Sequence, residues 1–424
     1  MERYKKLLKE CGISIYAVKE KTTESVEAFF IKKNLDTRRI RNTSETTIQV
    51  CREIEEDGNK FIGRAEVVVN SKSPDEEIKE RLLSAYESAK YAKMPFYDIN
   101  EREVSDEVDA RAEFKGKDLL TVAKEFSDAV YEEDNDPAAF INSFELFVTD
   151  EHVHIITSKE SDVKYVKRIV SGEFVAQCKE PQDVETYMDF KYDAPAINEI
   201  KNLVKETLKT TADRAKATEA PESGNYDVIL SDRYMPTMMS YYLDRSNAAF
   251  IFQGYSSFEK GAKPQGDDVK GDVLDMDLAV TEPFDALAAK MIERPMIKNG
   301  ELQNIHGAAP FLHYLDLPKI GSYEKVKVHE GNISINDMKK NPCLYVVNFS
   351  DFQMDALSGY FGGEIRLAYL FDGKGNVSLV TGGSINGSFL NAQKDIRLSS
   401  ETIRLYDYEG PKAMLLKNIS VAGK

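Results

Sequence analysis

Apolar residues in the first half of the chain recur with two spacings, one typical of strands and one typical of helices. Short apolar runs bounded by polar or glycine-containing turns predict strands. These runs are residues 26–32, 46–55, 61–69, 144–148, 153–157, 163–170 and 173–177. Turns at Asp57-Gly58, Asp150-Glu151 and Ser171-Gly172 are expected to join neighbouring runs into hairpins.

Helices are predicted where apolar residues return every three or four positions. The expected helices are residues 2–11, 73–93, 119–131 and 194–217. The first is too charged to bury much. The second starts with a capping signal, because Ser73 can accept a backbone N–H, Pro74 suits the first turn and Glu76 completes a capping box. Hairpins followed by a helix thus occur twice, at 26–93 and 144–217, which suggests a repeated architecture.

The second half follows a segment of linker composition, residues 217–225. A strand is expected at 226–231, then a helix with Met238, Met239, Tyr242 and Leu243 inward. Further strands are expected at 344–347, 364–371 and 376–381, with a polar loop at 350–360. We expect an α+β fold of two domains. Residues 1–217 form hairpins with helices packed on a sheet, and residues 218–424 form a mixed sheet that approaches a barrel.

Composition narrows the class of protein. A net charge of −16 and no basic stripe argue against direct binding to nucleic acid, which depends on lysine and arginine. No apolar run approaches the roughly 18 residues that span a bilayer. The N-terminus lacks the apolar core of a secretory signal, so a cytoplasmic protein without membrane contact is expected. The 4 cysteines are far apart and form no CxxC pair, which indicates reduced thiols.

The stretch from Cys343 to Leu390 resembles the C-terminal domain of the TldD/PmbA family, which carries the label modulator of DNA gyrase. Its features are a short strand, the polar segment SDFQMDALSGYF, a hairpin and a small-residue exit. A second segment, EPFDALAAKMIERPMIKNGELQNI, is similar to the family at Glu282, Pro283, Phe284, Asp285, Ile297, Asn299, Gly300 and Leu302. It departs from the family pattern at 286–289, where alanines replace an acidic and glycine-containing part.

The resemblance also locates the family's catalytic motif. In the catalytic branch, a helix after the first strand of this domain carries HExxxH, whose histidines hold zinc and whose glutamate activates water. The corresponding positions here include Ser240, Tyr241, Asp244 and Arg245, without a histidine. The family's third, cysteine ligand is also missing from residues 407–424. The resemblance therefore implies the PmbA (TldE) branch, with no zinc, no other cofactor and no catalytic residue.

Other groups give weaker signals. His152 and His154 share a strand face and are interpreted as a solvent-facing pair. His306, His313 and His329 could converge on a metal, but their spacing does not require it. Asp351 and Asp355 could form an acid pair, although such pairs on polar loops are usually only solvated. The glycine pairs 362–363 and 382–383 have no phosphate-binding context, and Gly266-Asp267-Asp268 is expected in an exposed loop.

Two functions from different classes remain. The first is a non-catalytic subunit of a TldD/TldE-type metalloprotease that acts on small or unfolded peptides, as in peptide maturation or antitoxin turnover. Its partner would be a TldD-like zinc subunit, and its chamber would hold peptides by strand addition. Candidate lining residues are Ser350, Asp351, Gln353, Asp355, Ser358, Gly359 and Tyr360. The second is an independent peptide-binding or scaffold homodimer linked to gyrase modulation. A third hypothesis, a stand-alone hydrolase with relocated ligands, predicts stoichiometric bound metal.

Overall fold

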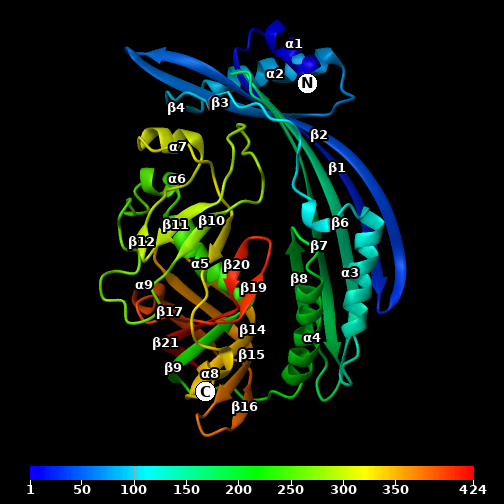
Figure 1. Ribbon diagram of the computed structural model, residues 1–424, viewed down its shortest axis with the longest axis vertical. Coiled ribbons are helices and arrows are strands. Elements are labelled where there is room, and N and C mark those ends of the chain that lie inside the picture. Colours follow the sequence, from blue (N-terminus) through cyan, green and yellow to red (C-terminus); the bar gives the residue numbers. More distant parts are fainter. Residues whose placement is uncertain (100–101) are drawn as a thin grey trace.

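A computed structural model describes residues 1–99 and 102–424. The first half forms one large sheet with the strand order β4-β3-β2-β1-β6-β7, and both β5 and β8 also pair with β7. Its strands are β1 (Ile15–Ile31), β2 (Asn34–Glu56), β3 (Asn59–Val69), β4 (Lys93–Pro95), β5 (Val108–Asp109), β6 (Ala139–Thr157), β7 (Asp162–Cys178) and β8 (Val184–Tyr192). The long central strands arch from one end of the molecule to the other (Figure 1).

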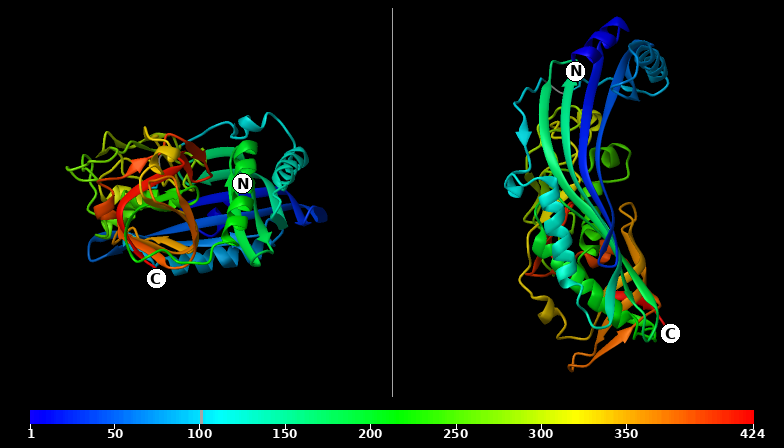
Figure 2. Two further views of the ribbon diagram at one scale, coloured as in Figure 1. Left: turned by 90° about the horizontal axis from the view of Figure 1, so that it is seen from below. Right: turned by 90° about the vertical axis from the view of Figure 1, so that its right-hand side faces the viewer.

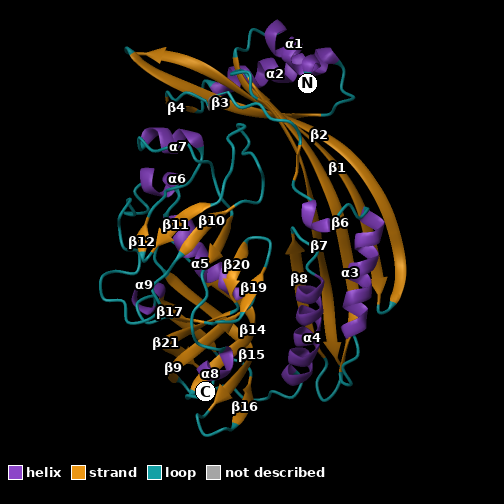
Figure 3. Cartoon of the chain, in the orientation of Figure 1, coloured by secondary structure: helices purple, strands orange, loops and turns teal. Residues whose placement is uncertain are grey.

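Helices cover this sheet at both ends (Figure 3). They are α1 (Glu2–Glu10), α2 (Asp75–Ala89), the 3₁₀ helix η1 (Ala112–Phe114), α3 (Leu119–Glu133) and α4 (Ile197–Arg214). α1 and α2 share one apolar cluster with β1, β2 and β3, whereas α3 and α4 share another with β6, β7 and β8. The expected succession of meander and helix is therefore present twice, as β1-β2-β3-α2 and β6-β7-β8-α4.

Several local predictions for this half are wrong. β6 and β7 run without a break through Asp150-Glu151 and Ser171-Gly172, so neither dipeptide is a turn. The Ser73 side chain does not cap α2: Pro74 is the N-cap residue, and the Ser73 hydroxyl instead donates to Glu77 Oε1 at 3.2 Å. α1 buries three side chains despite its charge. The polar and acidic segment 97–117, in which no regular element is predicted, contains β5 and η1; its residues 100–101 lie outside the described part of the chain.

The second half is built around a closed barrel. β9 (Gly224–Ser231), β14 (Cys343–Met354), β15 (Tyr360–Phe371), β17 (Ser384–Ser388) and β21 (Ala413–Ala422) follow the order β14-β9-β21-β17-β15, and β15 pairs back with β14. The end view in Figure 2 shows this ring. β16 (Val377–Val380) pairs with β15, and β18 (Arg397–Leu398) pairs with β21. The expected α+β fold with a barrel-like second half is confirmed.

A smaller sheet lies beside the barrel, in the order β12-β11-β10-β13-β20-β19. It contains β10 (Met276–Ala279), β11 (Arg294–Lys298), β12 (Glu301–Leu302), β13 (Lys325–Val328), β19 (Thr402–Arg404) and β20 (Tyr408–Pro411). The helices of this half are α5 (Tyr234–Arg245), α6 (Ala248–Phe252), α7 (Ala309–Tyr314), α8 (Ile335–Met338) and α9 (Phe389–Ala392). Residues of α5, the barrel and the small sheet form the largest apolar core.

Within the described residues, the strands up to β8 pair only with one another, and so do those from β9 onward. A division of the chain between residues 217 and 218 stays a prediction. None of the described helices combines the length and the apolar character needed to cross a membrane.

Candidate functional site: a cleft between the large sheet and the barrel

α5 has one face in the core and one face toward a cleft. β9 ends at Ser231, and Asp232 takes a left-handed backbone conformation with φ of 55°, which turns the chain directly into the helix. Met238 and Met239 are completely buried, as their helical spacing predicts. Residues 236, 237 and 240 lie on the other face and line the cleft.

The positions that the family resemblance assigns to HExxxH carry groups unsuited to a dication. The Ser240 hydroxyl donates to the carbonyl of Thr237 at 2.9 Å. The Arg245 guanidinium lies over the ring of Tyr241, 5.6 Å from its centroid, and donates to the carbonyls of Ala356 and Leu357 at 3.2 Å each. Burial raises the pKa of the nearby Asp244 carboxyl. A cation, an aromatic ring and a hydroxyl bonded to its own helix do not form the donor set that zinc requires.

The histidines do not replace those ligands. Both ring nitrogens of His306 are engaged, Nε2 with the carbonyl of Leu243 at 2.9 Å and Nδ1 with the amide of Tyr323 at 3.1 Å. His329 and His154 each contact an aspartate, and His313 is exposed. Among the described residues, no cluster of three or more His, Cys, Asp and Glu side chains could hold a metal ion.

The cleft has two adjoining compartments. The first, which we call the outer compartment, has a volume of about 1060 Å³. Strand β8, the end of α4, α5 and strands β14 and β15 contribute to its wall. Of the predicted site residues, the structure brings Ser240, Ser350 and Asp351 together in this compartment. Residues 350–354, expected in a loop, belong to β14 and pair with β15 across several irregular positions.

The other candidate residues lie beside the compartment and do not line it. Asp355 organises the turn between β14 and β15: it accepts from the Leu357 amide at 2.9 Å and from the Ser358 hydroxyl at 2.5 Å. The Ser358 bond lowers the pKa of Asp355. Gly359 and Tyr360 complete this turn. Gln353 donates to Asp351 at 2.9 Å, and no bond joins Asp351 to Asp355 among the described residues.

Two strands expose an unpaired edge to the outer compartment. β8 pairs only with β7 among the described strands, and six of its residues line the compartment. β14 pairs with β9 only from Leu344 to Val346, so no described strand pairs with this edge beyond that point, where the Phe349 amide donates to the Tyr234 hydroxyl at 3.0 Å. The lining segment of β14 is 348–352. An open edge presents free backbone N–H and C=O groups, which can pair with an added extended chain.

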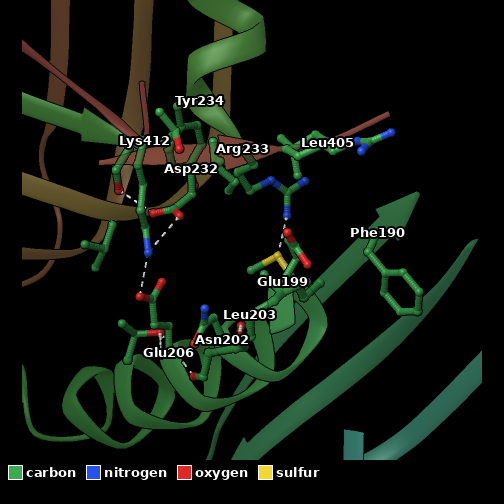
Figure 4. A pocket seen from close by; sticks show the side chains of 18 of the residues that line it. Phe190, Glu199, Asn202, Leu203, Glu206, Asp232, Arg233, Tyr234, Leu405 and Lys412 are labelled. Atoms are coloured by element: carbon green, nitrogen blue, oxygen red, sulfur yellow. Dashed lines mark hydrogen bonds and ion pairs between the residues drawn. The ribbon is translucent and has the colours of Figure 1, made fainter. Parts of the chain in front are cut away.

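An inner compartment of about 720 Å³ adjoins the first, and the two share Asp189, Phe190, Arg233, Tyr234 and Leu405. Figure 4 shows α4 on one side and the turn between β9 and α5 on the other. Lys412 joins these walls, with Nζ 2.6 Å from Glu206 and 3.5 Å from Asp232. Burial raises the pKa of Asp232 against the opposing effect of Lys412. Burial opposes the charge on Lys412, but Asp232 and Glu206 outweigh it and raise the pKa of Lys412.

Sequence reasoning missed the walls that β8 and α4 contribute. Their lining side chains are separated from those of α5 and β14 by up to 167 positions, from Glu185 to Phe352, and belong to no motif. The sequence signal for the β8 wall is its alternation, which places Glu185, Tyr187, Asp189 and Lys191 on one exposed strand face. It indicates a strand face outside a core but does not tell what faces it.

Known proteins share both the C-terminal domain and the overall fold of this chain. Residues 223–423 match the family described as the PmbA/TldA metallopeptidase C-terminal domain. TldE from Thermococcus kodakarensis has a TM-score of 0.77 and 14% identity, over 99% of this chain and 100% of that one. A proposed modulator of a DNA gyrase from Thermotoga maritima has a TM-score of 0.76 and 14% identity, over 99% of both chains. Another from Bacteroides thetaiotaomicron has a TM-score of 0.74 and 14% identity, over 100% of both chains.

No curated protein matches the chain in sequence. At 14% identity the solved structures establish the fold alone, whereas the family match covers the barrel and the sheet beside it. Residues 223–423 therefore carry the C-terminal domain of the PmbA/TldA metallopeptidase family, and the whole chain has the fold of TldE.

Proposed function

We propose that this chain is a non-catalytic, peptide-holding subunit of a TldD/TldE-type metalloprotease that acts on small or unfolded peptides. The observation that carries the proposal is the outer compartment, where the open edges of β8 and β14 lie beside an α5 face without metal-binding side chains. Backbone pairing at such edges accepts an extended chain of almost any sequence. An unfolded peptide supplies the extended chain that this geometry needs.

The chemistry of α5 supports a division of labour between two subunits. Arg245 places a positive charge in the segment that the family resemblance assigns to the zinc-binding motif, and it donates hydrogen bonds to two carbonyl groups of the turn after β14. The role that remains for this chain is to position the peptide. Activation of water would then belong to a TldD-like partner that carries HExxxH.

The test combines this chain with the TldD-type subunit of its own source and measures cleavage of an unstructured peptide. We expect the isolated chain to be inert and the mixture to be active and to co-elute. Ser240→Trp, which places a large ring in the outer compartment, is expected to reduce cleavage at least tenfold without loss of co-elution. Ser88→Trp, on the exposed side of α2, is the matched control and should have no effect. Cleavage by the isolated chain would contradict the proposal.

A second candidate is an independent peptide-binding or scaffold protein, acting as a homodimer and linked to modulation of DNA gyrase. The observation that favours it is that one chain supplies both open edges of the outer compartment. This candidate predicts that peptide binds with the same affinity whether or not a zinc-bearing subunit is present. Co-purification from native lysate, followed by zinc quantification, separates the two candidates.

A further inference from the structure

Two arginines face the outer compartment where the last turn of α4 meets the outside of the barrel. Arg214 is the final residue of α4, and Arg366 lies in β15. Both line the compartment. The Arg214 Nη1 atom donates to the backbone carbonyl of Glu185, at the beginning of β8, over 2.8 Å. Arg214 therefore lies at one end of the open β8 edge.

Arg214 has no ionic partner among the described residues. The neighbouring Asp213 accepts from Tyr369 Oη at 2.9 Å, and Glu364 is 3.4 Å from Arg366 and accepts from Ser350 Oγ at 2.5 Å. The nearby carboxylates are thus already engaged. Burial, and after it the positive charge of Arg366, lower the pKa of Arg214. A half-buried guanidinium beside a second positive charge has an unsatisfied need for an anion.

None of the other carboxylates that line the compartment forms an ion pair with Arg214 among the described residues; they are Glu185, Asp189, Glu324, Asp351 and Asp407. Asp189 is paired with Arg233 at 3.1 Å, and Asp351 accepts from Gln353 at 2.9 Å. A guanidinium presents a planar array of donors that matches a carboxylate in a bidentate arrangement. The excess positive charge at this end of the compartment therefore suits a carboxylate that arrives with a ligand.

We propose that Arg214 and Arg366 bind the C-terminal carboxylate of a peptide that lies along the open β8 edge. This inference rests on the proposed function, because it takes an extended peptide as the occupant of the outer compartment. It adds a direction and a preference: the peptide ends at Arg214, and a free C-terminus is favoured over an internal segment of a longer chain.

The test uses a fluorescently labelled octapeptide of alternating valine and serine, made as the free acid and as the C-terminal amide. Binding to the full chain is measured by anisotropy at low and high salt. We expect the free acid to bind about tenfold more tightly than the amide, the ratio typical of a hydrogen bond to a charged group. Arg214→Gln and Arg366→Gln should each reduce this ratio to about threefold or less. Arg81→Gln, an exposed arginine of α2, is the matched control and should leave the ratio unchanged.

The outcomes separate the two proposals. Equal binding of acid and amide overturns the inference and leaves the proposed function standing. Binding of neither form by the chain, alone or with its TldD-type partner, overturns both. A preference for the acid that survives in the Arg214→Gln, Arg366→Gln double variant also overturns the inference. The Arg366→Gln variant alters a side chain that is 44% exposed, so it reports on binding even where Arg214→Gln lowers stability.

Discussion

Both ring nitrogens of His306 form hydrogen bonds, which connect the end of α5 to the loop before β13. The Leu243 carbonyl can only accept a hydrogen bond and the Tyr323 amide can only donate one. The ring is therefore neutral, with its proton on Nε2. Burial lowers the pKa of His306 to about 4. His306, whose spacing in the sequence allowed a role as a metal ligand, is thus a neutral residue of the core. Its position in the sequence does not indicate this role.

The neutral state of His306 makes stability depend on pH. Between the ordinary histidine pKa near 6.5 and about 4, the unfolded chain binds a proton here that the folded chain does not. The free energy of unfolding therefore falls as the pH drops through this window, by up to about 1.4 kcal/mol per pH unit. We expect His306→Gln to be less stable at pH 7 but to lose less stability on acidification. Urea unfolding at pH 7, 6 and 5 measures both, and parallel pH profiles for the two proteins would contradict the assignment.

At the scale of the elements, helices and the β2–β3 hairpin follow the sequence closely, whereas the long strands do not. Asp57-Gly58 is a turn and 119–131 is helical, because these signals act within a few residues. β6 and β7 instead pass through polar dipeptides. There the pairing of β6 with β1 on one side and β7 on the other outweighs local turn preference.

The candidate site was predictable only in part, for a related reason. Ser240, Ser350 and Asp351 were identified because the family resemblance pointed to α5 and β14. The opposite wall comes from β8 and α4, which the packing of the large sheet against the barrel brings into place. Such long-range packing leaves no periodic signal in the sequence.

Gly172 is predicted in a turn but lies inside β7, where its lack of a side chain permits close packing. An added Cβ would overlap the backbone oxygen of Glu145 and lie 2.7 Å from Cζ of Phe190. We expect Gly172→Ala to cost about 2 kcal/mol through overpacking. Gly224→Ala is the control, since its Cβ would meet only a Tyr226 ring atom, at 3.6 Å. Denaturant midpoints measure both variants, and equal midpoints would show that the space at residue 172 is not limiting.

At the scale of the whole molecule, the segment that includes Glu282 and Phe284 joins the barrel half to the large sheet. Phe284 packs in a buried cluster with Tyr165 of β7, 6.4 Å between ring centroids. The Glu282 carboxylate accepts from Lys167 at 2.5 Å and from the Tyr165 hydroxyl at 2.9 Å. The residues that carry the family resemblance in this segment therefore hold the two halves in register, and with them the two walls of the cleft.

The Glu282–Lys167 pair is suited to a double-mutant cycle. Lys167 has only 8% of its side chain exposed, against 30% for Glu282. Among the described residues, Glu282→Gln therefore leaves the buried ammonium with Glu151, 3.4 Å away, as its one ionic partner. Allowing for the exposure of Glu282, we expect this change to cost about 2 kcal/mol of unfolding free energy. Lys167→Met removes the charge that needs a partner, so the double variant should recover about half of that loss. Urea unfolding measures the four proteins. Strictly additive effects would mean that Glu282 and Lys167 do not couple the two halves, which would then be held at this segment by the apolar contact of Phe284 and elsewhere by ion pairs such as Lys412–Glu206.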